Sequence, residues 1–130
     1  MLPFSIELRP GLPLAEQILF AVKKAVVSGQ LRPGDKFPSV RQLSQELRVN
    51  PNTAHKVVAA LVAENVLLST PAVGTVVAAP VAGSRRERAA LLGSELERVI
   101  VEAKKFGLDI HDVQAAVEAH WRKLSEPSKS

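Results

Sequence analysis

The stretch FPSVRQLSQELRVNPNTAHKVVAALVAEN, residues 37–65, contains two short helical patterns separated by too few residues to form a loop. The first pattern begins with Ser39, which can cap a helix and which forms a capping box with Gln42. Leu43 and Leu47 then give this helix an apolar stripe. We therefore expect a short helix that ends at the sequence Arg-Val, immediately before a second helix.

The second pattern starts with Asn50, which can act as the N-cap, and with Pro51, which fits the first helical position because no backbone donor is needed there. Apolar residues then recur at helical spacing, at Ala54, Val57, Val58, Leu61 and Val62. Two helices placed this close together predict a helix-turn-helix.

The polar face of the second helix carries groups that suit DNA recognition. Asn52 and Lys56 lie roughly opposite the apolar stripe. The major groove of B-DNA admits one helix, whose N-terminal side chains hydrogen-bond to base edges while nearby cations bind phosphate. The alternative is that Asn-Pro-Asn-Thr only starts a helix, but Asn50 can cap it alone, which leaves Asn52 and Thr53 without an evident structural duty. We predict DNA contacts at Ser39, Arg41, Asn50, Pro51, Asn52, Thr53, His55 and Lys56.

Four motifs extend this pattern along the chain: PLAEQI at residues 13–18, SGQLRPGDKFPSVRQLSQEL at 28–47, VNPNTAHK at 49–56 and GTVV at 74–77. With these motifs, residues 13–77 resemble the winged-helix DNA-binding domain of GntR-type bacterial transcriptional regulators. The short remainder resembles the YtrA subfamily, whose members follow that domain with a small helical dimerisation region. The resemblance implies a sequence-specific transcriptional regulator, a homodimeric repressor that binds double-stranded DNA at an inverted-repeat operator.

The wing of such a domain is expected after the second helix, with a strand at residues 66–70, a turn, and a returning strand at 75–78. Members of the family usually carry a Gly-x-Gly tip with basic residues, whereas this tip reads Pro-Ala-Val-Gly and has no cation. The backbone amide of Gly74 and the hydroxyl of Thr75 remain as groups that can reach phosphate. A hairpin that only closes the domain is the alternative.

The N-terminal part supports the same domain. Residues 1–12 are rich in Pro and Gly, and we expect them to lie extended against the domain. Apolar spacing predicts a packing helix from Pro13 to Ser28, with Gly29 as its left-handed cap. Phe37 is expected in the core.

The C-terminal part begins after residues 78–84, AAPVAGS, which lack periodicity and mark a boundary. Apolar residues spaced three and four apart from Ala89 to Phe106 predict one helix that packs along a narrow seam, and Gly107 ends it. Asp109 caps a second helix, and the final SEPSKS is expected to fray. Two such helices cannot bury both apolar stripes against each other, so we expect the same pair from a second copy to cover them. The predicted dimerisation residues are Leu92, Leu96, Val99, Ala103, Phe106, Ile110, Val113, Val117 and Trp121.

The predicted architecture is therefore mostly α with a small β-hairpin wing. A winged helix-turn-helix domain spans residues 1–79, and a two-helix dimerisation region spans residues 80–130. A ligand pocket usually needs roughly 300 Å³ or more, which we do not expect from two helices of one chain. Any small-molecule effector is therefore placed at the dimer junction or between the domains.

Composition limits the other function classes. The chain has 130 residues, 46% of them hydrophobic, no cysteine and a net charge of +4. Residues 1–80 hold eight Lys and Arg against five Asp and Glu, which favours a polyanionic partner for that half. No secretory signal and no membrane-spanning run are evident, so we expect a cytoplasmic protein.

Neither catalysis nor metal binding is predicted. There is no cysteine nucleophile and no glycine-rich phosphate loop, so we expect no catalytic residues and no cofactor. His111 and His120 lie about 180° apart on a helix and cannot share one metal ion. The run Arg-Arg-Glu-Arg at residues 85–88 is interpreted as a solvated helix start. The competing interpretation of the whole chain is a winged-helix module that binds protein, which lacks the steep salt dependence of phosphate binding.

Overall fold

The computed structural model describes residues 1–125, which divide into two compact units. Unit 1 comprises residues 1–80, with which the described residues 124 and 125 are grouped, and unit 2 comprises residues 81–123. The predicted fraying of the C-terminal tail concerns residues 126–130, which lie outside the described residues.

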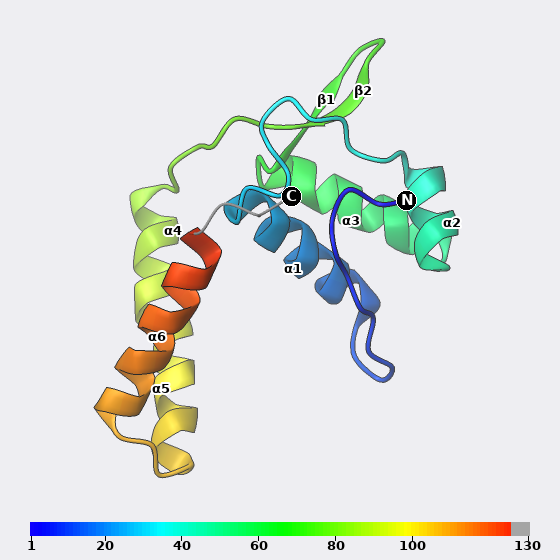
Figure 1. Ribbon diagram of the computed structural model, residues 1–130. Helices are drawn as coiled ribbons and strands as arrows, with labels where there is room; N and C mark the ends of the chain where they lie inside the picture. Colours follow the sequence, from blue (N-terminus) through cyan, green and yellow to red (C-terminus); the bar gives the residue numbers. More distant parts are fainter. Residues whose placement is uncertain (126–130) are drawn as a thin grey trace. The chain divides into compact units, whose positions relative to one another are not determined.

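Unit 1 is a winged helix-turn-helix, as predicted. Its helices and strands follow in the order α1 (Leu14–Val27), α2 (Val40–Leu47), α3 (Pro51–Ala63), β1 (Leu67–Thr70) and β2 (Gly74–Val77). Helix α3 contacts α1, α2 and β1, so it is the central helix of the unit. Figure 1 shows α2 and α3 joined by a very short turn, with the antiparallel hairpin extending beyond α3.

The two predicted caps begin α2 and α3. The Ser39 hydroxyl accepts a hydrogen bond from the backbone N–H of Gln42 at 3.1 Å, and the Asn50 side-chain oxygen accepts one from the N–H of Asn52 at 2.8 Å. The expected capping box at α2 is wrong in its second half. The side chain of Gln42 does not return to Ser39 but donates to the carboxylate of Glu46 at 2.9 Å, because Glu46 lies one turn along the same helix.

The turn between α2 and α3 depends on Ser44. Its hydroxyl donates to the carbonyl of Val49 at 2.8 Å, and its own carbonyl accepts from the N–H of Val49 at 3.1 Å. Ser44 is 8% exposed, so the hydroxyl satisfies a carbonyl that the protein shields from water. Arg48 closes α2 in the left-handed conformation, with φ of 55°. These bonds fix where α3 begins relative to α2.

The core of unit 1 joins the N-terminal segment to the helices. Phe4 packs parallel to Phe37 with ring centroids 5.8 Å apart, which confirms that the first residues lie against the domain and that Phe37 is a core residue. The largest fully buried side chains are Ile18, Val22, Leu31, Leu43, Val57, Leu61, Leu67 and Val77. Every helix and strand of unit 1 therefore contributes to one core.

The hairpin is slightly displaced from the expected strands, and a third segment pairs with it. In the register, Leu67 lies opposite Val77 and Thr70 lies opposite Gly74, so the strands begin at residues 67 and 74. The N–H of Phe37 donates to the carbonyl of Thr75 at 2.8 Å, and the N–H of Val77 donates to the carbonyl of Asp35 at 2.8 Å. The segment before α2 thus runs antiparallel beside β2.

Unit 2 contains a long helical segment and a returning helix. The first consists of α4 (Arg85–Ala90), the π-helical segment η1 (Leu91–Glu95) and α5 (Leu96–Lys105), and the second is α6 (Ile110–Ser125). The expectation of one regular α-helix is therefore wrong. The π turns coincide with Gly93 and Ser94, which are weak helix formers, and they change which residues share a face before and after them.

The connection between α5 and α6 follows the predicted caps. The N–H of Gly107 donates to the carbonyl of Lys104 at 3.1 Å, and the N–H of Leu108 donates to the carbonyl of Ala103 at 2.9 Å. This pair of bonds is a Schellman motif, and Gly107 supplies its positive φ of 76°. Asp109 and Asp112 then exchange backbone-to-carboxylate hydrogen bonds of 2.9 and 3.0 Å at the start of α6.

Candidate nucleic-acid interface

The buried face of α3 determines which residues its other face exposes. Ala54, Val57 and Leu61 are each 0% exposed, so the rotation of α3 about its axis is fixed by the core. The opposite side holds Asn52 and Lys56, both exposed, and farther along it alanines are also exposed. Because the alanines present no bulk, the N-terminal polar groups stand on a low helical surface that a DNA groove can accommodate.

The remaining predicted contacts surround this face. Asn50, Pro51 and His55 are exposed, whereas Thr53 is half-buried at the edge of the face. The amide oxygen of Asn50 is engaged in the cap, so its NH₂ group is the part left for a ligand. The hydroxyl of Ser39, the N-cap of α2, is likewise engaged as an acceptor, while the exposed Arg41 side chain carries the positive charge of that helix.

Four exposed cations accompany the helix-turn-helix: Lys36, Arg41, Arg48 and Lys56. Among residues 1–125, none of them takes part in an ion pair. The nearby carboxylate, Glu46, is bound by the ammonium group of Met1 and by the amide of Gln42, and these two hydrogen bonds lower the pKa of Glu46. The surface therefore keeps an uncompensated positive charge.

The wing supplies backbone and hydroxyl groups but no charge. Gly74 is exposed and Thr75 is half-buried. At the tip, the N–H of Val73 donates to the carbonyl of Thr70 at 3.3 Å, and Ala72 adopts a left-handed φ of 68°. The tip keeps the conformation that glycine favours although alanine occupies the position.

Lys36 is a candidate that the sequence prediction left out of the site. It pairs with Val76 in an isolated bridge, so it lies beside β2 although it comes 38 residues before Gly74 in the chain. Its side chain is exposed, whereas the next residue, Phe37, is buried. No local pattern in the sequence places Lys36 next to the wing, because its position there depends on the pairing of two segments that are distant in the chain.

Unit 2 exposes many large apolar side chains. Of the predicted dimerisation residues, Leu92, Leu96, Val99, Phe106, Ile110, Val117 and Trp121 have exposed side chains, from 40% to 73%. Ala103 is 7% exposed and Val113 is half-buried. These last two are therefore used within the hairpin of α5 and α6 and do not belong to its outer surface.

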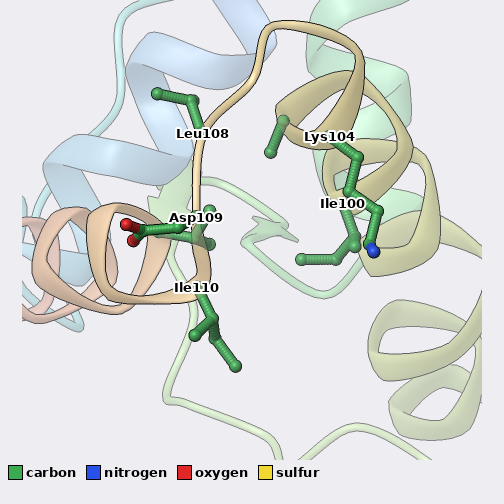
Figure 2. Close-up of a pocket in the computed structure, with 7 residues that line it drawn as sticks. Ile100, Lys104, Leu108, Asp109 and Ile110 are labelled. Atoms are coloured by element: carbon green, nitrogen blue, oxygen red, sulfur yellow. The ribbon is translucent and has the colours of Figure 1, made fainter.

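A hollow lies between the two helices of unit 2. It measures about 300 Å³ and is lined mainly by the apolar side chains of α5, the turn and the start of α6. Figure 2 shows Ile100 and Lys104 on one side and Leu108, Asp109 and Ile110 on the other. This volume is at the lower limit of ligand pockets, so one hairpin offers more space than the sequence led us to expect.

The comparisons with known proteins agree with this geometry. The family described as bacterial regulatory proteins, gntR family, matches residues 14–77. The chain is 29% identical over 106 residues to the HTH-type transcriptional repressor YtrA of Bacillus subtilis (strain 168), covering 81% of this chain and 82% of YtrA.

Two solved structures extend the comparison to unit 2. A transcriptional antiterminator from Listeria monocytogenes EGD-e matches with a TM-score of 0.82 and 25% identity, over 98% of this chain and 97% of that one. YtrA from Sulfolobus acidocaldarius, a GntR-family transcription factor, matches with a TM-score of 0.54 and 24% identity over 92% and 97% of the chains, and it shares the fold.

A helix-turn-helix with an exposed polar face, an accompanying wing and an excess of cations defines a DNA-binding transcriptional regulator rather than an enzyme. The chain belongs to the GntR family of bacterial regulators and is YtrA-like within it. None of the helices in residues 1–125 combines the length and the apolar composition that crossing a bilayer requires.

Proposed function

We propose that this chain is a homodimeric repressor that binds an inverted-repeat operator in the cytoplasm. The observation that carries the proposal is the exposed polar N-terminal face of α3, which its buried opposite face holds in place. YtrA of Bacillus subtilis is named a repressor, and this supports the same direction of regulation here.

Base recognition is assigned to Asn52 and Thr53. They are the second and third residues of α3, after the N-cap Asn50 and Pro51, so they stand at the end of the helix that enters the major groove in helix-turn-helix proteins. The Asn52 side chain is exposed and can form paired hydrogen bonds with an adenine edge. The Thr53 side chain is half-buried, so its methyl and hydroxyl groups reach the bases only at the edge of the face.

Phosphate binding is assigned to the surrounding groups. Lys56 and His55 flank the base-contacting pair on α3, and Arg41 supplies a cation from α2. The wing contributes the backbone of Gly74 and the hydroxyl of Thr75. Lys36, which lies beside β2, provides the cation that the wing tip lacks. These contacts position the protein on the duplex, whereas the base contacts provide sequence discrimination.

Dimerisation is assigned to unit 2. Unit 2 contains about forty residues, a size at which a single core rarely suffices without oligomerisation. Leu92, Phe106 and Ile110 are each more than 60% exposed, and burying such side chains between two copies provides the stabilisation that the hairpin lacks. Two linked DNA-binding units then bind two half-sites of an inverted repeat.

An effector, where one acts, is placed at the dimer junction. The hollow between α5 and α6 is lined in part by Ile110, whose exposed side chain the second copy is proposed to cover. A small molecule bound there would contact both the hairpin and its partner. Its binding would therefore be coupled to the arrangement of the two DNA-binding units.

The test of base recognition compares three single variants on the operator. DNase footprinting of the DNA upstream of the chain's own gene identifies the site, and we expect two protected half-sites in inverted orientation. Asn52→Ala and Thr53→Ala should each cost about 1–3 kcal/mol on this site with little change on unrelated DNA. Lys56→Ala should weaken both duplexes alike and lower the salt slope by about one unit. Equal loss of discrimination in all three variants contradicts the assignment.

The test of dimerisation is sedimentation of the full chain at micromolar concentration. Val99 is 57% exposed on α5, and Val99→Asp places an unpaired charge in the proposed interface. We expect a dimer for the unaltered chain and a monomer for this variant. Arg98→Asp changes a neighbouring exposed residue and serves as the matched control. A monomeric unaltered chain shows that the interface lies elsewhere.

A further inference from the structure

Three arginines at the start of unit 2 form a cluster that the helix-turn-helix does not explain. Arg85, Arg86 and Arg88 occupy the first turns of α4, and all three side chains are exposed. Within the described residues, no ion pair involves any of them. They pack against no core, because α4 contains no buried residue.

The one carboxylate within this run is engaged elsewhere. Glu87 accepts a hydrogen bond from the backbone N–H of Ser84 at 2.9 Å, and the hydroxyl of Ser84 accepts one from the N–H of Glu87 at 3.0 Å. This capping box turns Glu87 back toward the helix start. Its hydrogen bonds with Ser84 lower the pKa of the Glu87 carboxyl, which keeps the box in its charged form. Glu87 therefore stabilises the helix rather than neutralising the arginines.

The spacing along the helix offers the arginines no other partner. Stabilising ion pairs on a helix join residues three or four positions apart. No Asp or Glu lies at those positions after any of the three, and Arg88 lies three residues after Arg85, which is a like-charge pair. Residues 65–84, which precede the cluster, contain no acidic residue. Cations in the first turn of a helix also oppose the helix dipole. The cluster is therefore unfavourable for the folded chain alone.

The connection to unit 1 limits how far the cluster can lie from bound DNA. Seven residues, 78–84, separate the end of β2 from α4. A fully extended chain of this length reaches roughly 23–25 Å. B-DNA carries one phosphate charge for about every 1.7 Å of its axis, so a duplex segment of 25 Å presents about fifteen of them. Phosphates next to the half-site are therefore within reach of the tether.

We propose that Arg85, Arg86 and Arg88 form a second phosphate-binding element, which contacts the backbone of double-stranded DNA beside the half-site occupied by α3. Guanidinium groups suit this role because they bind phosphate through paired hydrogen bonds. The element adds affinity without adding sequence discrimination. The proposal rests on the DNA binding proposed for α3, and the experiment below separates the two.

The experiment measures binding of the full chain to a fluorescent 30-base-pair duplex of mixed sequence, by anisotropy over a range of salt concentrations. The variant Arg85→Gln, Arg86→Gln, Arg88→Gln keeps good helix formers at these positions. We expect its slope of log affinity against log salt to fall by about two to three units, since each lost phosphate contact removes about 0.9. The control Arg98→Gln, Arg122→Gln, Lys123→Gln removes three positive charges from unit 2 and should leave the slope close to that of the unaltered chain.

A second variant tests the same element in the opposite direction. Glu87→Gln retains a residue that can complete the capping box but removes the negative charge between the arginines. We expect tighter binding to the same duplex, a result that misfolding does not produce. An unchanged slope in the triple variant, or no gain in Glu87→Gln, overturns the proposal while leaving the role of α3 intact. Absence of any binding by the unaltered chain at low salt instead overturns the DNA binding of α3.

Discussion

Units 1 and 2 of this chain bury their apolar side chains to very different degrees. In unit 1, Ile18, Leu43 and Leu61 are each 0% exposed, and one core connects all of its helices and strands. In unit 2, Leu92 and Phe106 are 71% and 72% exposed. Unit 1 thus contains the packing partners that its helices need, whereas the helices of unit 2 are defined by local caps and leave most of their apolar surface unpacked.

The difference shows that helix formation and helix packing can be encoded separately. The capping box at Ser84, the Schellman motif at Gly107 and the reciprocal bonds at Asp109 each act within a few residues. Such signals determine where a helix starts and ends, but each contributes only about 0.5–2 kcal/mol. A helix held by caps alone is marginal in water. Unit 2 is therefore the part of the chain for which the proposed dimerisation would contribute most to stability.

The largest expected effect comes from removing a core side chain of unit 1. Leu61 lies on α3 at 0% exposure, so Leu61→Ala should destabilise unit 1 by about 2–5 kcal/mol through lost burial and a cavity. Thermal or denaturant unfolding followed by circular dichroism measures this. Leu92→Ala is the same change at an exposed position of unit 2, and its effect should instead appear in the association of two chains. Equal destabilisation by both variants would contradict the conclusion that unit 1 buries its apolar side chains internally and unit 2 does not.

The next effect concerns the separation of DNA binding in unit 1 from the dimerisation proposed for unit 2. A fragment of residues 1–80 should fold and unfold cooperatively by itself because it contains the whole core. It should sediment as a monomer and bind the operator about 10²-fold or more weakly, because a second linked contact is effectively intramolecular in the full chain. A fragment that still dimerises contradicts this division.

The sequence predicted those features of the molecule that depend on neighbouring residues and missed those that depend on distant ones. The helices, their caps and the hairpin of unit 1 depend on neighbouring residues, so the patterns around Ser39 and Asn50 were sufficient to place them. The hydrogen bond of Ser44 to the turn and the position of Lys36 beside β2 depend on how distant segments meet, and local patterns do not carry that information. The assignment of individual DNA contacts stays a prediction.

The π-helical segment illustrates the same limit in unit 2. Apolar residues spaced three and four apart from Ala89 to Phe106 predicted one regular seam. Gly93 and Ser94 weaken the α-helical pattern between them, and the structure has π turns there. The periodicity of hydrophobic residues was not sufficient because it describes only which residues are apolar, whereas the face on which they lie depends on the backbone between them.

A smaller effect is expected from the turn that connects α2 and α3. Ser44→Ala removes the hydroxyl that donates to the Val49 carbonyl and leaves that carbonyl without this partner in a buried position. The cost should be about 1 kcal/mol in the unfolding of unit 1, with weaker DNA binding because the orientation of α3 is less restrained. Gln45→Ala, at an exposed position next to it, should change stability by no more than about 0.5 kcal/mol. A Ser44 variant as stable as the Gln45 variant shows that the turn is held by its backbone bonds alone.

The smallest effect should be a gain, at the tip of the wing. Pro71 and Ala72 occupy the central positions of a turn closed by the Val73 N–H and the Thr70 carbonyl, and the φ of 68° at Ala72 is the conformation that a type II turn requires of its third residue. Glycine adopts this conformation without the steric cost that a Cβ introduces, although it also has more freedom to lose on folding. Ala72→Gly should therefore stabilise unit 1 by about 0.5–1 kcal/mol, measured as a rise of a few degrees in its melting temperature.

The control for this gain is the same substitution where alanine suits the backbone. Ala59 is exposed in the middle of α3, so Ala59→Gly should destabilise the helix by about 1 kcal/mol. Opposite signs at the two positions would show that local backbone conformation, rather than lost side-chain contacts, determines both results. A loss of stability in Ala72→Gly would mean that the strain at the tip does not limit the stability of the wing. The pairing of β2 with β1 and with the segment before α2 would then hold the wing in place.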